Sequence, residues 1–279
     1  MILRRECRSF ELGGNQQVDI KFTTDFNPFF SMKYNPAYLL TLLCFPFFLG
    51  AQEPEPIPRT EGVFRVVAFG DSITGDRPGI AYRHQYIKWS DVLQAILETQ
   101  LGEGKAEVLN MGFAGDRTFA AGDRPGAVNR VESNILAQQP DVAVILIGGN
   151  NMGGRNVDTE AMLARTREDL TLIVRQVREA GIEVLLLQYT EPKAEDMSRV
   201  WSHLNDVNPA IAAVAEAEGV PTLELTPHFA HAAQTLPLNA LLNPVDGVHL
   251  QPYGELVIGR AVAAKLNQLG WIECQLTSR

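Results

Sequence analysis

The sequence predicts an α/β protein, a three-layer α/β/α sandwich around a five-stranded parallel sheet. Five short apolar runs recur along the chain, and longer segments with helical spacing separate them. Several of the runs are nearly continuous in Val, Ile and Leu, which is typical of strands buried on both faces. Strands that alternate with helices are joined by right-handed crossovers into a parallel sheet with helices on both faces.

The five expected strands cover residues 63–70, 106–112, 141–149, 182–190 and 220–226. In sheets of this kind, ligands bind at the carboxyl ends of the strands. Polar segments follow the first three strands: GDSIT, MGFAGDR and GGNN. We therefore expect a functional site at that edge of the sheet.

The clearest expected helix follows Asp158, which can cap its start, and Gly181 can end it. Its apolar residues recur mostly three or four positions apart. Further helices are expected over residues 86–100, 131–138, 201–217 and 253–269.

The first 62 residues differ in character from the remainder. After Met32 come Lys33, an apolar run of about 15 residues ending at Ala51, and a proline-rich stretch. This order predicts a signal peptide over 32–51, a linker over 52–62 and a single domain over 63–272. Residues 1–31 are expected to be an extended leader or a misassigned start, with Met32 as the true start. The protein is then secreted or periplasmic.

An uncleaved signal that anchors the chain is the lesser alternative, because a membrane span needs roughly 20 apolar residues and Pro46 interrupts this run. After cleavage we expect no stable membrane insertion. Lipid attachment at Cys44 is disfavoured, since the residue before it is large and it lies inside the apolar run. Processing would remove Cys7 and Cys44 and leave Cys274, so no internal disulfide is expected.

The composition describes a globular chain of 279 residues, with a formal net charge of -9. Without a Lys/Arg cluster, a polyanionic partner such as nucleic acid is not expected. The histidines are scattered and no H-E-x-x-H or paired-cysteine motif occurs, so neither a metal nor a cofactor is expected. The sequence does not indicate an oligomeric state.

Ser72 follows the first expected strand, in FGDSIT. Taken alone, a serine at this position is more often a turn or cap residue. As a nucleophile it would need a nearby base, because a hydroxyl is weakly nucleophilic at its own pKa.

His249 is the best candidate base among His84, His203, His228, His231 and His249. In DGVHLQP, Asp246 precedes it by three residues, and such a turn can bring carboxylate and imidazole together. The alternative is a capping aspartate beside an unrelated histidine.

Two further residues could stabilise an oxyanion. Gly115 lies in NMGFAGDRT, where glycine lets the backbone approach a substrate closely. Asn150, in LIGGNNMGG, can supply a side-chain N–H, and the Ser72 amide a third donor. Each also has a turn explanation, and we expect Asn151 to support the turn from within.

Together, FGDS at Ser72, N-x-G-x-x-G ending at Gly115, G-x-N ending at Asn150 and D-x-x-H at His249 resemble the four motif blocks of the SGNH hydrolase (GDSL esterase/lipase) superfamily. The resemblance covers residues 63–269. It implies a flavodoxin-like sheet, a Ser72, Asp246 and His249 triad, and oxyanion donors from Ser72, Gly115 and Asn150. One departure is Asn151, where many members carry aspartate. The rival α/β-hydrolase fold lacks support, because its G-x-S-x-G elbow is missing.

The expected activity is that of an exported serine esterase acting on a small-molecule or polysaccharide ester, removing short acyl (acetyl) groups from carbohydrate. A lysophospholipase, short-chain lipase or thioesterase is the alternative enzyme, and a non-catalytic exported binding module is the disfavoured one. The residues that could line the site's mouth lie near the first two motifs: Arg77, Tyr82, Arg83, Arg117 and Arg124.

Overall fold

The structure is a computed structural model that describes residues 54–75, 87–153, 157–193 and 203–272. The expected leader over 1–31 and signal over 32–51 lie outside these residues. So do the three cysteines, His84 and three of the expected mouth residues (Arg77, Tyr82 and Arg83). The predictions made for these segments and residues are therefore not tested by the structure.

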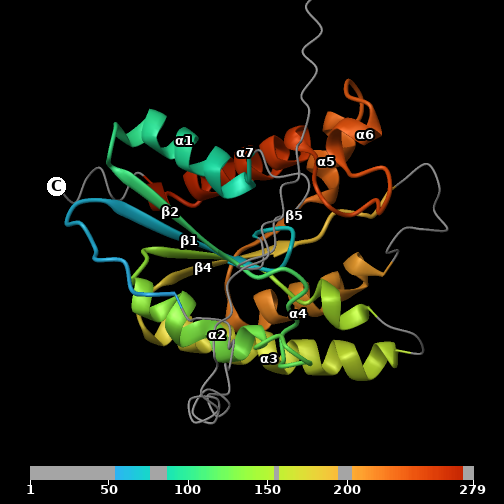
Figure 1. The fold of residues 1–279 in the computed structure, drawn as a ribbon. Helices are drawn as coiled ribbons and strands as arrows, with labels where there is room; N and C mark the ends of the chain where they lie inside the picture. Colours follow the sequence, from blue (N-terminus) through green and yellow to red (C-terminus); the bar gives the residue numbers. More distant parts are fainter. Residues whose placement is uncertain (1–53, 76–86, 154–156, 194–202, 273–279) are drawn as a thin grey trace, which may run out of the picture. The chain divides into compact units, whose positions relative to one another are not determined.

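The described chain forms one five-stranded parallel sheet in the order β2-β1-β3-β4-β5 (Figure 1). This is the flavodoxin-like order, and the predicted fold class is confirmed. The strands are β1 (Phe64–Gly70), β2 (Ala106–Gly112), β3 (Val142–Leu146), β4 (Glu183–Gln188) and β5 (Thr222–Glu224).

The strands follow the apolar runs, although the third, fourth and fifth end earlier than predicted. All residues of the central strands β1 and β3 are buried, as their unbroken apolar sequences require. The third strand stops at Leu146 because Gly148 takes a φ of 114° and a 3-10 turn, η3 (Gly149–Met152), follows. The fifth stops at Glu224, since helix α5 (Thr226–Ala232) begins with a proline in its first turn.

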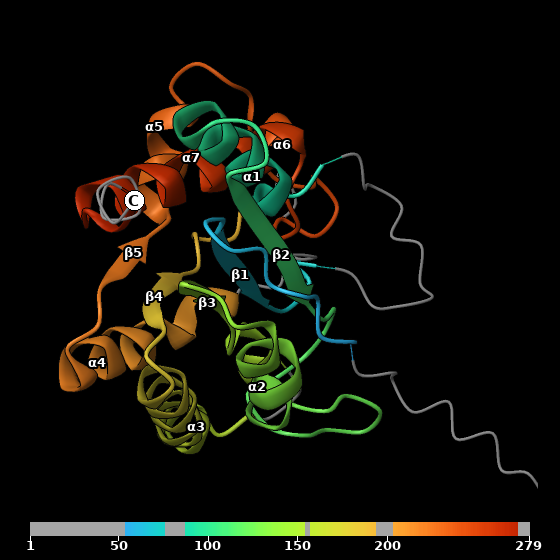
Figure 2. The same ribbon diagram turned by 90° about the vertical axis from the view of Figure 1, so that its left-hand side faces the viewer.

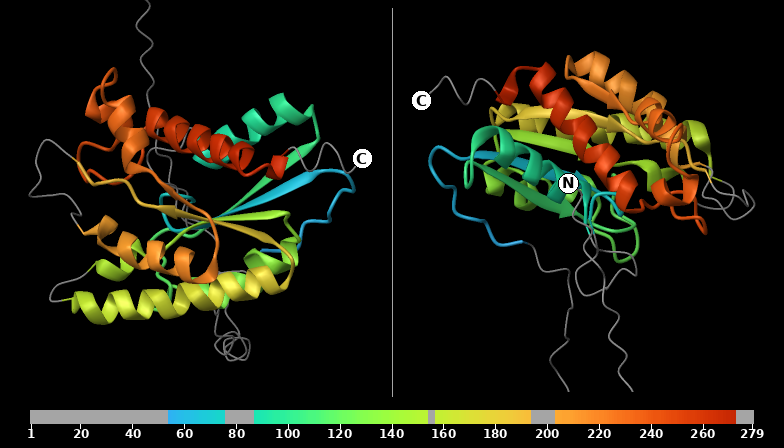
Figure 3. Two further views of the ribbon diagram at one scale, coloured as in Figure 1. Left: turned by 180° about the vertical axis from the view of Figure 1, so that it is seen from behind. Right: turned by 90° about the horizontal axis from the view of Figure 1, so that it is seen from above.

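Helices cover both faces of the sheet (Figure 2). One face carries α5, with α1 (Trp89–Leu101), α6 (Leu238–Leu241) and α7 (Pro252–Gln268). The other carries α2 (Ala127–Asn134), α3 (Thr159–Glu179) and α4 (Asn208–Glu218), and Figure 3 shows α3 and α4 side by side beneath the sheet. Two helical layers on a buried sheet give the three-layer architecture that the sequence predicts.

The helix predictions hold best where local signals are strong. Helix α3 starts as expected, with the Asp158 carboxylate accepting the Ala161 N–H at 3.0 Å. The helix predicted over 131–138 was wrong in extent, because α2 begins at Ala127 and a separate 3-10 turn, η2 (Leu136–Gln138), follows. The segment predicted over 201–217 contains η5 (Leu204–Val207) and then α4. The short helices α5 and α6 were not predicted.

Within the described residues, no helix combines the length and apolar character that crossing a bilayer requires.

The loops after β1, β2 and β3 leave adjacent strands at their carboxyl ends, and these loops carry Ser72, Gly115 and Asn150.

Candidate active site

Ser72 lies in a tight turn directly after β1. The Asp71 carbonyl closes this turn by accepting the N–H groups of Thr74 and Gly75 at 3.1 and 2.9 Å. The Ser72 Oγ lies 3.0 Å from Nε2 of His249, and Nδ1 of His249 lies 3.0 Å from Oδ2 of Asp246. The structure therefore brings the predicted nucleophile, base and carboxylate into one hydrogen-bonded chain.

The loop before α7 fixes the Asp246 and His249 pair by its own backbone. The other Asp246 oxygen, Oδ1, accepts the N–H groups of Val248 and His249, each at 2.9 Å. Burial pushes the pKa of Asp246 up, but the hydrogen bonds from the His249 ring and from these N–H groups outweigh it and leave the pKa below its ordinary value. Asp246 is therefore a carboxylate at neutral pH.

This carboxylate decides which nitrogen of His249 carries the proton. A carboxylate accepts and does not donate, so the hydrogen bond at Nδ1 requires the proton there. Nε2 then presents its lone pair to the Ser72 hydroxyl. The arrangement can move the serine proton to His249, as general base catalysis requires.

Gly115 occupies a turn whose backbone conformation favours glycine. Its φ is 74°, and a Cβ at this position would lie 2.7 Å from Nε of Arg124. The Arg124 guanidinium thus packs directly on the Gly115 backbone. Of the other expected mouth residues, Arg117 donates to the Gly153 carbonyl at 3.2 Å and lies over the Phe119 ring.

Asn150 joins the three loops. Its Nδ2 donates to the Asp116 carbonyl at 2.9 Å and, over a longer 3.3 Å, to Oδ2 of Asp71. Asp71 precedes Ser72, and Asp116 follows Gly115 in the chain. The structure therefore brings the side-chain amide of Asn150 next to the loops that carry the two other predicted oxyanion donors.

Asn151 makes a different set of contacts from its neighbour. Its Oδ1 accepts the Thr118 N–H at 3.1 Å, and its Nδ2 donates to the hydroxyls of Thr118 and Thr166 at 2.8 and 2.7 Å. These bonds tie η3 to the loop after β2 and to α3. The side chain is buried at 1% exposure, which is the geometry of a turn support.

Arg130 is a buried residue that supports the site, and the sequence did not indicate this role. Its guanidinium bonds Oδ2 of Asp116 at 2.8 Å and the carbonyls of Met111 and Gly70 at 2.9 and 3.1 Å, and it lies 4.4 Å from the Phe69 ring centroid. Burial lowers the pKa of Arg130 and raises that of Asp116, with their mutual attraction opposing both shifts. Arg130 thereby holds the ends of β1 and β2 together.

Asp71 and Tyr189 form a second buried pair that the sequence reasoning missed. Asp71 is fully buried, with Oδ1 accepting the Ile73 N–H at 3.0 Å and Oδ2 accepting the Tyr189 hydroxyl at 2.6 Å. Burial raises the pKa of Asp71 to about 6 against these hydrogen bonds. Tyr189 lies 118 positions after Asp71, so no local sequence pattern indicates this contact.

The remaining described histidines lie elsewhere. His203, directly before η5, faces Asp206 at 3.0 Å in an exposed pair, and His228 and His231 are on α5. Within the described residues, no group of three or more His, Cys, Asp or Glu side chains could hold a metal ion.

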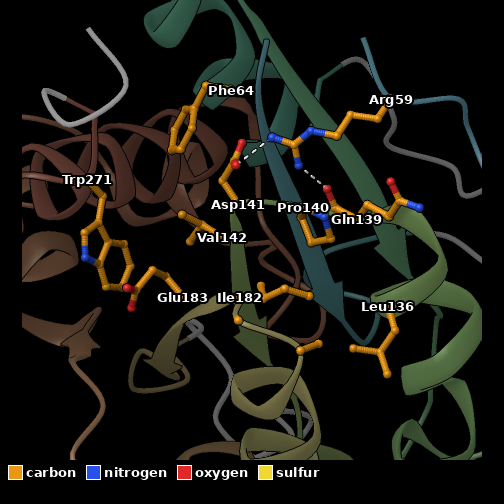
Figure 4. Close-up of a pocket in the computed structure, with 12 residues that line it drawn as sticks. Arg59, Phe64, Leu136, Gln139, Pro140, Asp141, Val142, Ile182, Glu183 and Trp271 are labelled. Atoms are coloured by element: carbon orange, nitrogen blue, oxygen red, sulfur yellow. Dashed lines mark hydrogen bonds and ion pairs between the residues drawn. The ribbon is translucent and has the colours of Figure 1, made fainter. Parts of the chain in front are cut away.

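One pocket of about 470 Å³ lies at the opposite edge of the sheet, where β1, β3 and β4 begin (Figure 4). Figure 4 shows the Arg59 guanidinium turned toward Asp141 and the Gln139 carbonyl, both of which it binds. Trp271 and Glu183 line another side. Since Ser72 follows the carboxyl end of β1, this pocket is separate from the candidate active site.

The sequence matches the model of the GDSL-like Lipase/Acylhydrolase family over residues 68–255, more than half of the chain. No curated protein matches it.

Among solved structures, the fold is similar to three esterase-type enzymes. They are a lipase/acylhydrolase from Enterococcus faecalis (TM-score 0.54, 23% identity, covering 73% of this chain and 95% of that one), the inhibitor-bound form of an aryl esterase from M. smegmatis (0.57, 16%, 74% and 100%) and a catalytic mutant of an acetylxylan esterase from Geobacillus stearothermophilus (0.55, 20%, 73% and 94%). At these identities the likeness concerns the fold. The family match, over a segment that contains Ser72, Gly115, Asn150, Asp246 and His249, identifies the protein as a carboxylic-ester hydrolase of the GDSL-like lipase/acylhydrolase family.

Proposed function

We propose that the protein is an exported serine esterase that works through an acyl-enzyme. Ser72 is the nucleophile, His249 the general base and Asp246 the residue that orients His249. The observation that carries this proposal is the continuous chain from Ser72 Oγ to His249 Nε2 and from His249 Nδ1 to Asp246, with both distances 3.0 Å.

In the first half-reaction, His249 takes the Ser72 proton as Oγ attacks the ester carbonyl. The N–H groups of Ser72 and Gly115 and the side chain of Asn150 stabilise the oxyanion of the tetrahedral intermediate. His249 then protonates the leaving alcohol, and the acyl-enzyme forms. Water, deprotonated by His249, attacks this ester; His249 then returns the proton to Ser72 Oγ as the acid leaves.

For the substrate, we propose a short acyl group, acetyl above all, on a carbohydrate. The support is the similarity in fold to an acetylxylan esterase together with the signal-like segment over 32–51, which predicts a secreted or periplasmic enzyme. A lysophospholipase, short-chain lipase or thioesterase is the alternative. A chain-length series of p-nitrophenyl esters, run beside acetylated xylan, separates them: preference for chains of about eight carbons or more would exclude the carbohydrate esterase.

Replacing Ser72 by alanine tests the nucleophile. We expect Ser72→Ala to fold with an unchanged melting temperature and to hydrolyse p-nitrophenyl acetate no faster than background, because the variant lacks the hydroxyl that forms the proposed acyl-enzyme. Ser133→Ala, on α2, is the matched control and should retain wild-type kcat. Hydrolysis by Ser72→Ala at the wild-type rate would overturn the assignment.

A further inference from the structure

Tyr189 lies directly after β4, beneath the loops of the candidate oxyanion hole, and has a 2% exposed side chain. Its hydroxyl makes two hydrogen bonds. It accepts the Gly149 N–H at 3.2 Å and donates to Oδ2 of Asp71 at 2.6 Å. Gly149 precedes Asn150 and Asp71 precedes Ser72, so one hydroxyl connects the loop of the proposed amide donor with the loop of the proposed nucleophile.

The same oxygen of Asp71 receives a second donor. Asn150 Nδ2 lies 3.3 Å from Oδ2 of Asp71, much farther than the Tyr189 hydroxyl at 2.6 Å. An amide nitrogen has two hydrogens, and the Asp116 carbonyl takes one of them at 2.9 Å. The other hydrogen faces Oδ2 of Asp71 at 3.3 Å, a longer and weaker bond than the one that the Tyr189 hydroxyl donates to the same oxygen.

We propose that Tyr189 is a positioning residue for ester hydrolysis: its hydroxyl holds the Gly149 N–H and Oδ2 of Asp71, and so keeps that oxygen at a long distance from Asn150, whose second N–H can then bond the oxyanion. This inference rests on the proposed function, in which Asn150 is an oxyanion donor. Without the hydroxyl, Asn150 would bond Asp71 more tightly and turn away from the substrate.

The Tyr189 hydroxyl is suited to this role because it stays protonated. Burial first, and the Asp71 carboxylate second, raise the pKa of Tyr189 well above its ordinary value. The hydroxyl is therefore a donor toward Asp71 throughout the pH range in which an esterase works.

Tyr189→Phe removes the hydroxyl and keeps the ring. Loss of a whole oxyanion donor lowers the rate by about 10²–10³, so misplacing one should lower kcat for p-nitrophenyl acetate by roughly tenfold. KM should stay within about twofold, because the lost interaction is made in the transition state. Tyr253→Phe, at a half-exposed position on α7, is the matched control and should leave both constants unchanged.

A double-mutant cycle with Asn150→Ala separates positioning from a general effect on the fold. If Tyr189 acts through Asn150, Tyr189→Phe should cost roughly tenfold in the wild-type background and less than about twofold beside Asn150→Ala. All variants are compared well below the lowest melting temperature among them. An equal cost in both backgrounds, or a wild-type kcat for Tyr189→Phe, would overturn the inference.

The failures of the two proposals are distinguishable. If Ser72→Ala and Asn150→Ala lose activity as expected but the cycle is additive, the serine mechanism stands and the role of Tyr189 does not. If Asn150→Ala keeps the wild-type kcat, Asn150 is not an oxyanion donor and the inference falls with it.

Discussion

Asn150 and Asn151 are neighbours of the same type whose side chains lie in different environments. Asn150 contacts the residues beside Ser72 and Gly115, whereas Asn151 bonds Thr118 and Thr166 within the protein. The preference of asparagine for turns explains the presence of either residue after a strand equally well. The resemblance to the family motif singled out Asn150, and the contacts of Asn151 are those of an amide that donates to two hydroxyl groups.

Both threonine hydroxyls around Asn151 have already used their hydrogens. Thr118 Oγ1 donates to Asp169 and Thr166 Oγ1 donates to the Met162 carbonyl, each at 2.7 Å. They can therefore only accept from Nδ2 of Asn151. A carboxylate there would face two acceptors and the nearby charge of Asp169.

We therefore expect Asn151→Asp to lower the free energy of unfolding by about 2–4 kcal/mol at pH 7. A buried carboxylate cannot donate the two hydrogen bonds that the Asn151 amide gives to the threonine hydroxyls. Urea unfolding measures this loss, with Asn239→Asp at an exposed position as control. Equal stability of Asn151→Asp and wild type would show that the threonine hydroxyls can turn to donate.

At the scale of elements, helix α7 holds the start of α1 through one buried carboxylate. Oε2 of Glu255 accepts the Trp89 N–H at 2.8 Å, and Lys88 Nζ lies 3.7 Å from Oε1. Burial raises the pKa of Glu255 to about 7, with Lys88 and the Trp89 N–H opposing the shift. The spacing of apolar residues predicted both helices. The hydrogen bond between Trp89 and Glu255 could not be predicted, because these residues lie 166 positions apart and neither segment alone indicates the contact.

The sign of this shift sets a pH dependence of stability. Between its ordinary pKa of 4.5 and about 7, Glu255 is more protonated in the folded than in the unfolded protein, so its contribution to stability is lost as the pH rises. We expect Glu255→Gln to remove that loss: on going from pH 5 to pH 8, its free energy of unfolding should improve relative to wild type by about 2–3 kcal/mol. Urea unfolding of both proteins at pH 5 and pH 8 measures this difference. An equal change in the free energy of unfolding of Glu255→Gln and wild type would contradict the prediction.

At the scale of the whole molecule, the candidate site combines four short segments that a parallel sheet places together. The order of the strands makes the ends of β1, β2 and β3 adjacent, and the loop before α7 adds Asp246 and His249. These segments could be predicted because each carries a local pattern at a strand end or a helix start. The pairs beneath them, Asp116 with Arg130 and Asp71 with Tyr189, could not, because only tertiary packing unites their elements.

The most direct test of the central claim, that Ser72 is the nucleophile, is covalent labelling with a fluorophosphonate followed by mass spectrometry of the peptides. We predict one adduct per chain, on Ser72, formed in parallel with the loss of p-nitrophenyl acetate hydrolysis and lacking in Ser72→Ala. An adduct on another residue, or full loss of activity without modification of Ser72, would contradict the account.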